Sequence, residues 1–199
     1  MRLLLVSLAL LTASSAAAQN KDVPTTDSAA IRKSIIAFYQ WYNASWKKVD
    51  SFKLYKSKKG NDGPPYIIDW KEVEKYFTYL RKNVPTAGKA FIENERRFFR
   101  QADKDFKENP EEEIPIGFDY DRFTNSQEEP DWFWKELNKK TNEWKIVVDN
   151  ADSNKAQVVI YQPAEGESAR RTGIFCGQMS KENGKWKMAR LNCSIYTAD

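Results

Sequence analysis

The order of two hydrophobic periodicities along the chain constrains its fold most. The first half repeats apolar residues every three or four positions, whereas the end consists of short alternating runs separated by Asp, Asn, Ser and Gly. The first pattern is typical of amphipathic helices and the second of antiparallel strands. We therefore expect an α+β domain, with N-terminal helices packed on a curved, mostly antiparallel four-stranded sheet.

The helices are predicted from apolar spacing and from polar residues at their starts. Asp27 or Ser28 and then Asp69 stand where an N-cap is needed, because their side chains can accept hydrogen bonds from free amides. Pro85 and Asn109-Pro110 end the second and third helices. The expected helices are 28–46, 70–82 and 86–107, with a short helical turn at 132–137 and a loop at 60–65.

The strands are predicted at 144–149, 156–162, 171–180 and 185–195. Between the last two, Asn183-Gly184 is a strong signal for a two-residue hairpin turn, because both positions need positive φ. Such a turn places Glu182 opposite Lys185 and, further along, Cys176 opposite Leu191.

The two cysteines, Cys176 and Cys193, are predicted to form a disulfide. In the predicted hairpin Cys193 lies diagonal to Cys176 on the same face, and a bulge would bring the two within bonding distance. Two free thiols packed as small apolar groups are the alternative.

Residues 1–18 predict that the chain is secreted, through an oxidising compartment in which a disulfide would form. They have the layout of a secretory signal peptide, with Arg2, a short apolar run and Ala16-x-Ala18 before the cleavage point. Residues 19–27 then form a flexible arm and 28–199 a single domain, which we expect to be exported to the periplasm or the medium. No segment of the sequence is apolar over a length that spans a bilayer.

The composition excludes several kinds of chemistry. The chain has no His, so Ser-His-Asp triads, Cys-His nucleophiles and His-ligated zinc are excluded. Its formal net charge of +4 is too small to indicate a nucleic-acid partner, and we expect none. We also expect no cofactor.

Two segments resemble known exported proteins. Helices followed by a meander that ends in Asn183-Gly184-Lys185-Trp186-Lys187-Met188 look like the cone-shaped nuclear transport factor 2-like fold. The helix that carries Phe38-Tyr39-x-Trp41-Tyr42 is similar to the long first helix of exported bacterial members of that fold.

Segment 117–128, GFDYDRFTNSQE, resembles a motif of the YbjP/YqhG-like exported family. In that family an Asp-Pro-Phe unit is followed by Ala-Gln-Asp. Here Arg122 replaces the Pro, Ser126 the Ala and Glu128 the second Asp. The family has no settled activity, so the resemblance implies a fold rather than a function.

The same segment is the sharpest local candidate for a site. Its clustered side-chain oxygens are of the kind that calcium prefers. The segment is not an EF-hand, because it lacks the Gly at the sixth position and the Glu at the twelfth. A structural loop, held by Asx turns and by Phe118 and Phe123, and a ligand or partner contact are the alternatives. The oxygen-bearing residues are Asp119, Asp121, Asn125, Gln127 and Glu128.

An enzyme could use Asp119 or Asp121 as a base, with Tyr39 or Tyr42 as a hydrogen-bond donor. The spacing does not select these aspartates over the other carboxylates of the chain. Most carboxylates are simply solvated surface groups.

The abundant aromatic residues predict either a packed core or a ligand pocket inside the cone. Arg190 and Asn192 would supply polar groups to such a pocket. The aromatic side chains expected there are Phe38, Tyr42, Trp46, Tyr161, Phe175 and Trp186.

Two oppositely charged segments complete the candidates. The lysine-rich 47–59 segment could attract phosphate groups or lipid heads, or could be a solvated loop. Together with the acidic 108–131 segment it could steer a charged protein partner.

We therefore expect a non-enzymatic binding module that takes a small apolar ligand in the cone or a protein partner across its mouth. A His-free isomerase, dehydratase or hydrolase with Asp119 or Asp121 as base, and a calcium-stabilised structural protein with the same aspartates as ligands, are the alternatives. The expected binding residues are Tyr42, Trp46, Arg190, Asp119, Asp121, Asn125 and Gln127.

Overall fold

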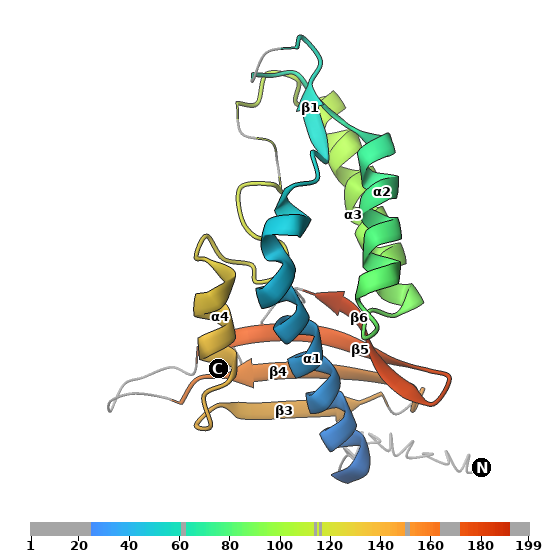
Figure 1. Cartoon of the computed structure of the whole chain (residues 1–199), viewed down its shortest axis with the longest axis vertical. Helices are drawn as coiled ribbons and strands as arrows, with labels where there is room; N and C mark the ends of the chain where they lie inside the picture. Colours follow the sequence, from blue (N-terminus) through green and yellow to red (C-terminus); the bar gives the residue numbers. More distant parts are fainter. Residues whose placement is uncertain are drawn as a thin grey trace, which may run out of the picture.

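A computed structural model describes residues 25–60, 63–113, 115, 117–149, 152–163 and 172–191. The described residues form an α+β fold whose helices contact a four-stranded antiparallel sheet, which confirms the predicted fold class (Figure 1). The helices are α1 (Thr25–Asp50), α2 (Trp70–Asn83), α3 (Lys89–Glu108) and α4 (Pro130–Leu137). The strands of the sheet are β3 (Glu143–Val148), β4 (Lys155–Tyr161), β5 (Gly173–Glu182) and β6 (Lys185–Leu191), paired in that order.

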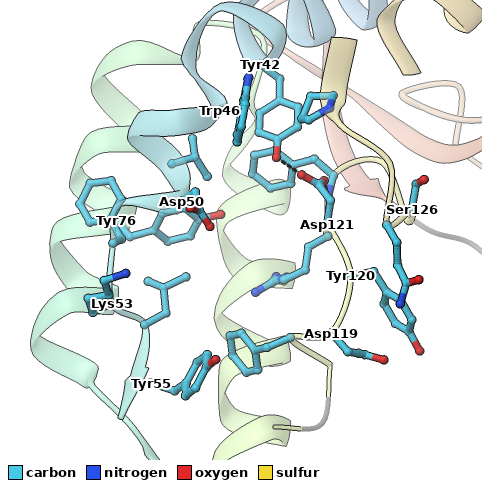
Figure 2. A pocket seen from close by; sticks show the side chains of 18 of the residues that line it. Tyr42, Trp46, Asp50, Lys53, Tyr55, Tyr76, Asp119, Tyr120, Asp121 and Ser126 are labelled. Carbon is cyan, nitrogen blue, oxygen red and sulfur yellow. Dashed lines mark hydrogen bonds between the residues drawn. The ribbon is translucent and has the colours of Figure 1, made fainter. Parts of the chain in front are cut away.

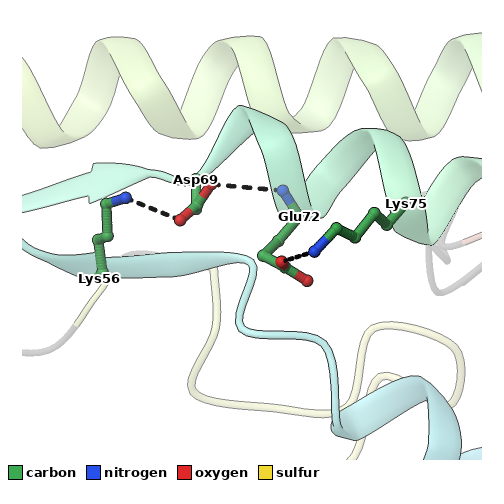
Figure 3. Close-up of polar contacts among 4 residues, drawn as sticks. All are labelled: Lys56, Asp69, Glu72 and Lys75. Carbon is green, nitrogen blue, oxygen red and sulfur yellow. Dashed lines mark hydrogen bonds and ion pairs between the residues drawn. The ribbon is translucent and has the colours of Figure 1, made fainter.

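Helix α2 begins where its sequence predicts. The Asp69 side chain accepts a hydrogen bond from the Glu72 amide at 3.3 Å, which satisfies one of the free amides of the first turn. The other carboxylate oxygen of Asp69 pairs with Lys56 Nζ at 2.8 Å (Figure 3). The cap therefore also ties the start of α2 to the preceding segment.

Helix α3 begins three residues later than predicted, because Thr86–Gly88 pair with the edge of the sheet instead. The Met188 amide donates to Thr86 O and the Gly88 amide donates to Met188 O, each at 2.8 Å. The predicted start at residue 86 is therefore wrong. This short pairing attaches the α2–α3 connection to β6.

The β5–β6 hairpin has the predicted turn but a different register beyond it. Asn183 and Gly184 have φ values of 51° and 73°, and Glu182 lies opposite Lys185. A bulge then shifts the register, so Gly177, not Cys176, lies opposite Leu191. The bulged residue is Ala189, whose carbonyl accepts a hydrogen bond from Asn94 Nδ2 on α3 at 2.8 Å.

Several predictions concern residues outside the described ranges. Cys176 is buried on β5, whereas Cys193 lies outside the described residues, so the Cys176–Cys193 disulfide stays a prediction. The predicted signal peptide at 1–18 also lies outside them. Among the described helices, none combines the length and the apolarity that crossing a bilayer requires.

A second, two-stranded sheet is formed by residues on either side of the predicted loop at 60–65, and the sequence predicts neither of its strands. Its antiparallel strands are β1 (Tyr55–Ser57) and β2 (Tyr66–Ile68). Residues 47–50 belong to α1, which runs four residues beyond its predicted end. Strands of three residues are too short to show the alternation from which strands are predicted.

The core fills the space between α1 and the sheet. Ile31, Ile35 and Phe38 of α1 are fully buried, and the Tyr39 ring packs edge-on against Phe175 of β5 with 5.7 Å between ring centroids. The N-terminal part of α1 crosses the sheet, whereas its C-terminal end stands away from the sheet beside α2 and α3 (Figure 1).

Candidate functional site

A cleft of about 1140 Å³ lies at the C-terminal end of α1. One wall comes from α1 and residues 52–57, and the facing wall comes from residues 118–130 (Figure 2). We call the facing wall, together with Gly117, the 117–130 segment. Aromatic side chains from both walls, and from β2 and α2, line the cleft. They are Tyr42, Trp46, Phe52, Tyr55, Tyr66, Tyr76, Phe118, Tyr120 and Phe123.

The structure divides the binding residues predicted from the sequence between two hollows. Five of them line the cleft, namely Tyr42, Trp46, Asp119, Asp121 and Gln127. Asn125 and Arg190 instead line a smaller hollow of about 290 Å³, beside α3 and the end of β6. Asn192, which the sequence groups with Arg190, lies outside the described residues.

Asp121 is anchored by both of its carboxylate oxygens. Oδ1 accepts hydrogen bonds from the amides of Phe123 and Thr124, each at 2.8 Å, and Oδ2 accepts one from the Tyr42 hydroxyl (Figure 2). The backbone around it closes a turn, in which the Asp121 amide donates to Ser126 O at 2.9 Å. Asp121 thus holds the 117–130 segment in shape and joins it to α1.

The next residue, Arg122, attaches the same segment to α3. Its Nη2 pairs with Glu95 Oε2 at 2.7 Å, and its guanidinium lies 3.4 Å from the ring centroid of Phe98. Glu95 also accepts a hydrogen bond from the Tyr76 hydroxyl of α2 at 3.0 Å. Both charged side chains are largely buried, so each needs the other to offset its desolvation.

Phe123 completes the attachment. Its ring packs against Phe38, Tyr42 and Phe91, and its carbonyl accepts a hydrogen bond from the Tyr39 hydroxyl at 2.6 Å. Three consecutive residues, 121–123, are therefore fixed to α1, α3 and the core. The wall that they form is held from two sides, by side chains of α1 and of α3.

Burial and charge keep the tyrosines of this region protonated. Desolvation, followed by the nearby Asp121 charge, raises the pKa of Tyr42 well above its ordinary value. The same causes act on Tyr39, and burial beside Glu95 raises the pKa of Tyr76. All three hydroxyls therefore act as hydrogen-bond donors at neutral pH.

The two aspartates that the sequence offers for catalysis or calcium have different surroundings. Asp121 already accepts hydrogen bonds from two amides and a tyrosine, as described above. Asp119 is exposed, and its hydrogen bond with Tyr120 raises the pKa of that phenol. Within the part of the chain that the structure describes, no group of three or more His, Cys, Asp or Glu residues could hold a metal ion.

The basic segment 47–59 and the acidic segment 108–131 are in contact, since the ring of Tyr55 packs against that of Phe118. The hydroxyl of Tyr66, on β2, donates a hydrogen bond to the carbonyl of Glu113 in the acidic segment at 3.0 Å. Lys56 of β1 is paired with Asp69.

Sequence reasoning missed much of the cleft wall. Tyr55 and Tyr66 come together because β1 and β2 pair, and Phe118 of the facing wall packs on Tyr55 with 4.8 Å between ring centroids. Asp50 was missed because the helix was predicted to end before it. The Tyr-x-Ser and Tyr-Ile-Ile runs on either side of the Gly/Pro-rich loop are the signal that could have indicated a hairpin.

Comparison with known proteins finds no matching family model, no similar curated protein and no similar solved structure.

Proposed function

We propose that this protein is a non-enzymatic binding module that takes a small ligand in the cleft between the end of α1 and the 117–130 segment. The cleft itself is the observation that carries the proposal. Its volume of about 1140 Å³ is somewhat above the roughly 300–1,000 Å³ of most small-molecule sites, so it has room for such a ligand. Aromatic walls with a few polar groups are the usual lining of such sites.

The proposal places the ligand away from the sheet. Tyr39 packs against Phe38, Phe133 and Phe175, so the space between α1, α4 and β5 is occupied by the protein's own side chains. The same helix leaves Trp46 only partly buried at its far end. Ligand binding therefore needs no rearrangement of the core.

The geometry favours binding over acid–base catalysis. A general base must have an oxygen free to accept a proton from the substrate. Asp121 uses its oxygens to hold the 117–130 segment, so moving a proton onto it would break contacts on which the cleft wall depends. Asp119 has the solvent exposure of an ordinary surface carboxylate.

We also propose that the chain is an exported member of the YbjP/YqhG-like family with a nuclear transport factor 2-like cone. The order of helices and antiparallel strands is compatible with that fold. The resembling segment 117–128 forms one wall of the cleft, and the Arg122 that departs from the family's motif has a partner in Glu95. Export rests on the sequence of residues 1–18.

A fragment screen tests the binding proposal. We expect small aromatic fragments to bind with one-to-one stoichiometry in ligand-observed NMR and to change tryptophan fluorescence. Trp46→Ala should weaken binding at least about fivefold, because aromatic contacts contribute on the order of 1 kcal/mol or more. Trp132→Ala is the matched control, because Trp132 is 42% exposed and is not among the residues that line the cleft.

A second variant guards against loss of structure. Tyr120 lines the cleft but is 49% exposed, so Tyr120→Ala should weaken fragment binding without lowering the melting temperature. Equal binding by the parent chain, Trp46→Ala and Tyr120→Ala would remove the cleft as the site.

A further inference from the structure

The lining of the cleft is acidic in a chain that is basic as a whole. Five carboxylates line it, against three basic side chains, whereas the whole sequence carries a formal charge of +4. A cleft lined mainly by one sign of charge concentrates ions of the opposite sign. The carboxylates are Asp50, Asp119, Asp121, Glu128 and Glu129, and the basic residues are Lys53, Lys56 and Arg122.

Two of the three basic side chains already have acidic partners outside the cleft lining. Arg122 is paired with Glu95, and Lys56 with Asp69. Lys53 stands on the α1 side of the cleft (Figure 2). Within the described residues, none of the five lining carboxylates forms an ion pair. Asp121 is engaged in hydrogen bonds that hold the cleft wall, so the charge of the other four is left to act on a ligand.

The negative charges stand on both sides of the space. Asp50 projects from the end of α1, and Asp119 and Asp121 come from the facing 117–130 segment (Figure 2). The C-terminal end of α1 adds a negative partial charge to the first side, because the peptide dipoles of a helix are aligned along its axis. A cation held between the walls would therefore be attracted from two directions.

The aromatic walls favour the same kind of ligand. Aromatic ring faces attract ammonium groups, and two rings of the α1 wall already do so. Lys47 Nζ lies 5.5 Å from the centroid of Trp46, and Lys48 Nζ lies 4.8 Å from that of Phe52. Neither lysine lines the cleft itself.

We infer that the ligand is a small organic cation, with an ammonium or quaternary ammonium group on an apolar body. The apolar body would lie on the aromatic walls, with its cationic group between Asp50 and Asp119. This inference rests on the proposed binding function and adds the charge of the ligand to it.

A set of matched probes separates charge from shape. Phenyltrimethylammonium, tert-butylbenzene and benzenesulfonate share one ring, and the first two have nearly the same shape. We expect the cation to bind, the anion to bind most weakly, and added salt to weaken only the cation. Removing both carboxylates, in Asp50→Asn/Asp119→Asn, should weaken binding of the cation about tenfold and leave tert-butylbenzene unchanged.

The control variant is Asp103→Asn/Asp152→Asn, which makes the same change of charge at two exposed ion pairs outside the cleft. It should leave the binding of all three probes unchanged. If tert-butylbenzene binds while the cation does not, or if the Asp50→Asn/Asp119→Asn variant binds the cation as the parent does, the inference is overturned and the binding module stands. If none of the three probes binds, the proposed function fails and the inference with it.

Discussion

The Tyr42 hydroxyl donates a hydrogen bond to Asp121 across the cleft, between residues that are 79 positions apart in the sequence. Tyr42 belongs to α1 and Asp121 to the 117–130 segment, so this contact joins the two walls, together with the hydrogen bond from Tyr39 to the Phe123 carbonyl. Because Asp121 also holds its own turn through two backbone amides, the spacing of the walls depends on it.

Tyr42→Phe tests this contact with little change in packing. The ring stays in the core, but Asp121 Oδ2 loses its donor, and we expect the free energy of unfolding to fall by about 1–2 kcal/mol. Urea denaturation measures the change. Tyr120→Phe is the matched control, because its hydroxyl is bound to the exposed Asp119, and it should cost less than about 0.5 kcal/mol. Equal stability of the two variants would contradict the anchoring role.

For the buried Arg122–Glu95 pair, removing one charged partner should cost more stability than removing both. Arg122→Met leaves the Glu95 charge without its partner, and we expect a loss of about 3–5 kcal/mol in the free energy of unfolding. Adding Glu95→Gln should recover part of the loss, because the charge is gone while an oxygen remains for the Tyr76 hydroxyl. Denaturant titrations measure the stability of both variants. If the double variant is less stable than Arg122→Met alone, the loss does not come from leaving the Glu95 charge unpaired.

Stability should fall at acid pH partly through Asp27. Hydrogen bonds from Trp186 and Lys181 lower the pKa of Asp27 below its ordinary 3.8. The unfolded chain keeps the ordinary value, so the stabilisation is complete above about pH 3.8 and is lost as the pH falls through the lower, folded pKa.

We therefore expect Asp27→Asn to cost about 1 kcal/mol at neutral pH, and the difference from the parent chain to shrink below pH 3.8. Denaturant titrations across this range measure it. Trp186→Phe, which removes the indole donor, should raise the pKa of Asp27 in NMR titrations. A stability difference that does not change on acidification would refute the linkage.

Gly88 lies where α3 meets the sheet, and a side chain there has no room. A Cβ would come within 2.6 Å of Glu182 Oε1 and 3.0 Å of the Met188 carbonyl. Glu182 also accepts a hydrogen bond from the Lys89 amide at 2.7 Å, so displacing it would uncap α3. We expect Gly88→Ala to destabilise the fold by about 1–3 kcal/mol in thermal or urea unfolding. Gly63→Ala, in open space, should be close to neutral, and equal effects would contradict the account.

The sequence predicts best those elements whose signals are local. Asp69 and Pro85 bracket α2, and Asn183-Gly184 sets the β5–β6 turn, because each acts on its own backbone. The end of α1 was missed because Lys47 and Lys48 interrupt the apolar stripe. Their basic groups suit the last turn of a helix, where the helix dipole is negative.

The site depends on contacts that no local spacing reveals. Tyr42 and Asp121 were both predicted as binding residues, but their hydrogen bond comes from the packing of α1 against the 117–130 segment. Asn125 and Arg190 line a second hollow. The turn closed by Asp121 and Ser126 separates the two spaces, with Asp121 and Ser126 lining the cleft and Asn125 lining the smaller hollow. The register of Cys176 was missed because the bulge at Ala189 serves a tertiary contact with Asn94.

Amide NMR with a bound fragment or phenyltrimethylammonium tests the location of the site most directly. If the cleft is the binding site, the largest chemical-shift changes will fall at residues 46–57 and in the 117–130 segment, and β3 and β4 will be unaffected. Changes concentrated on the sheet, or spread evenly over the molecule, would contradict the central claim that the two walls joined by Tyr42 and Asp121 enclose the ligand.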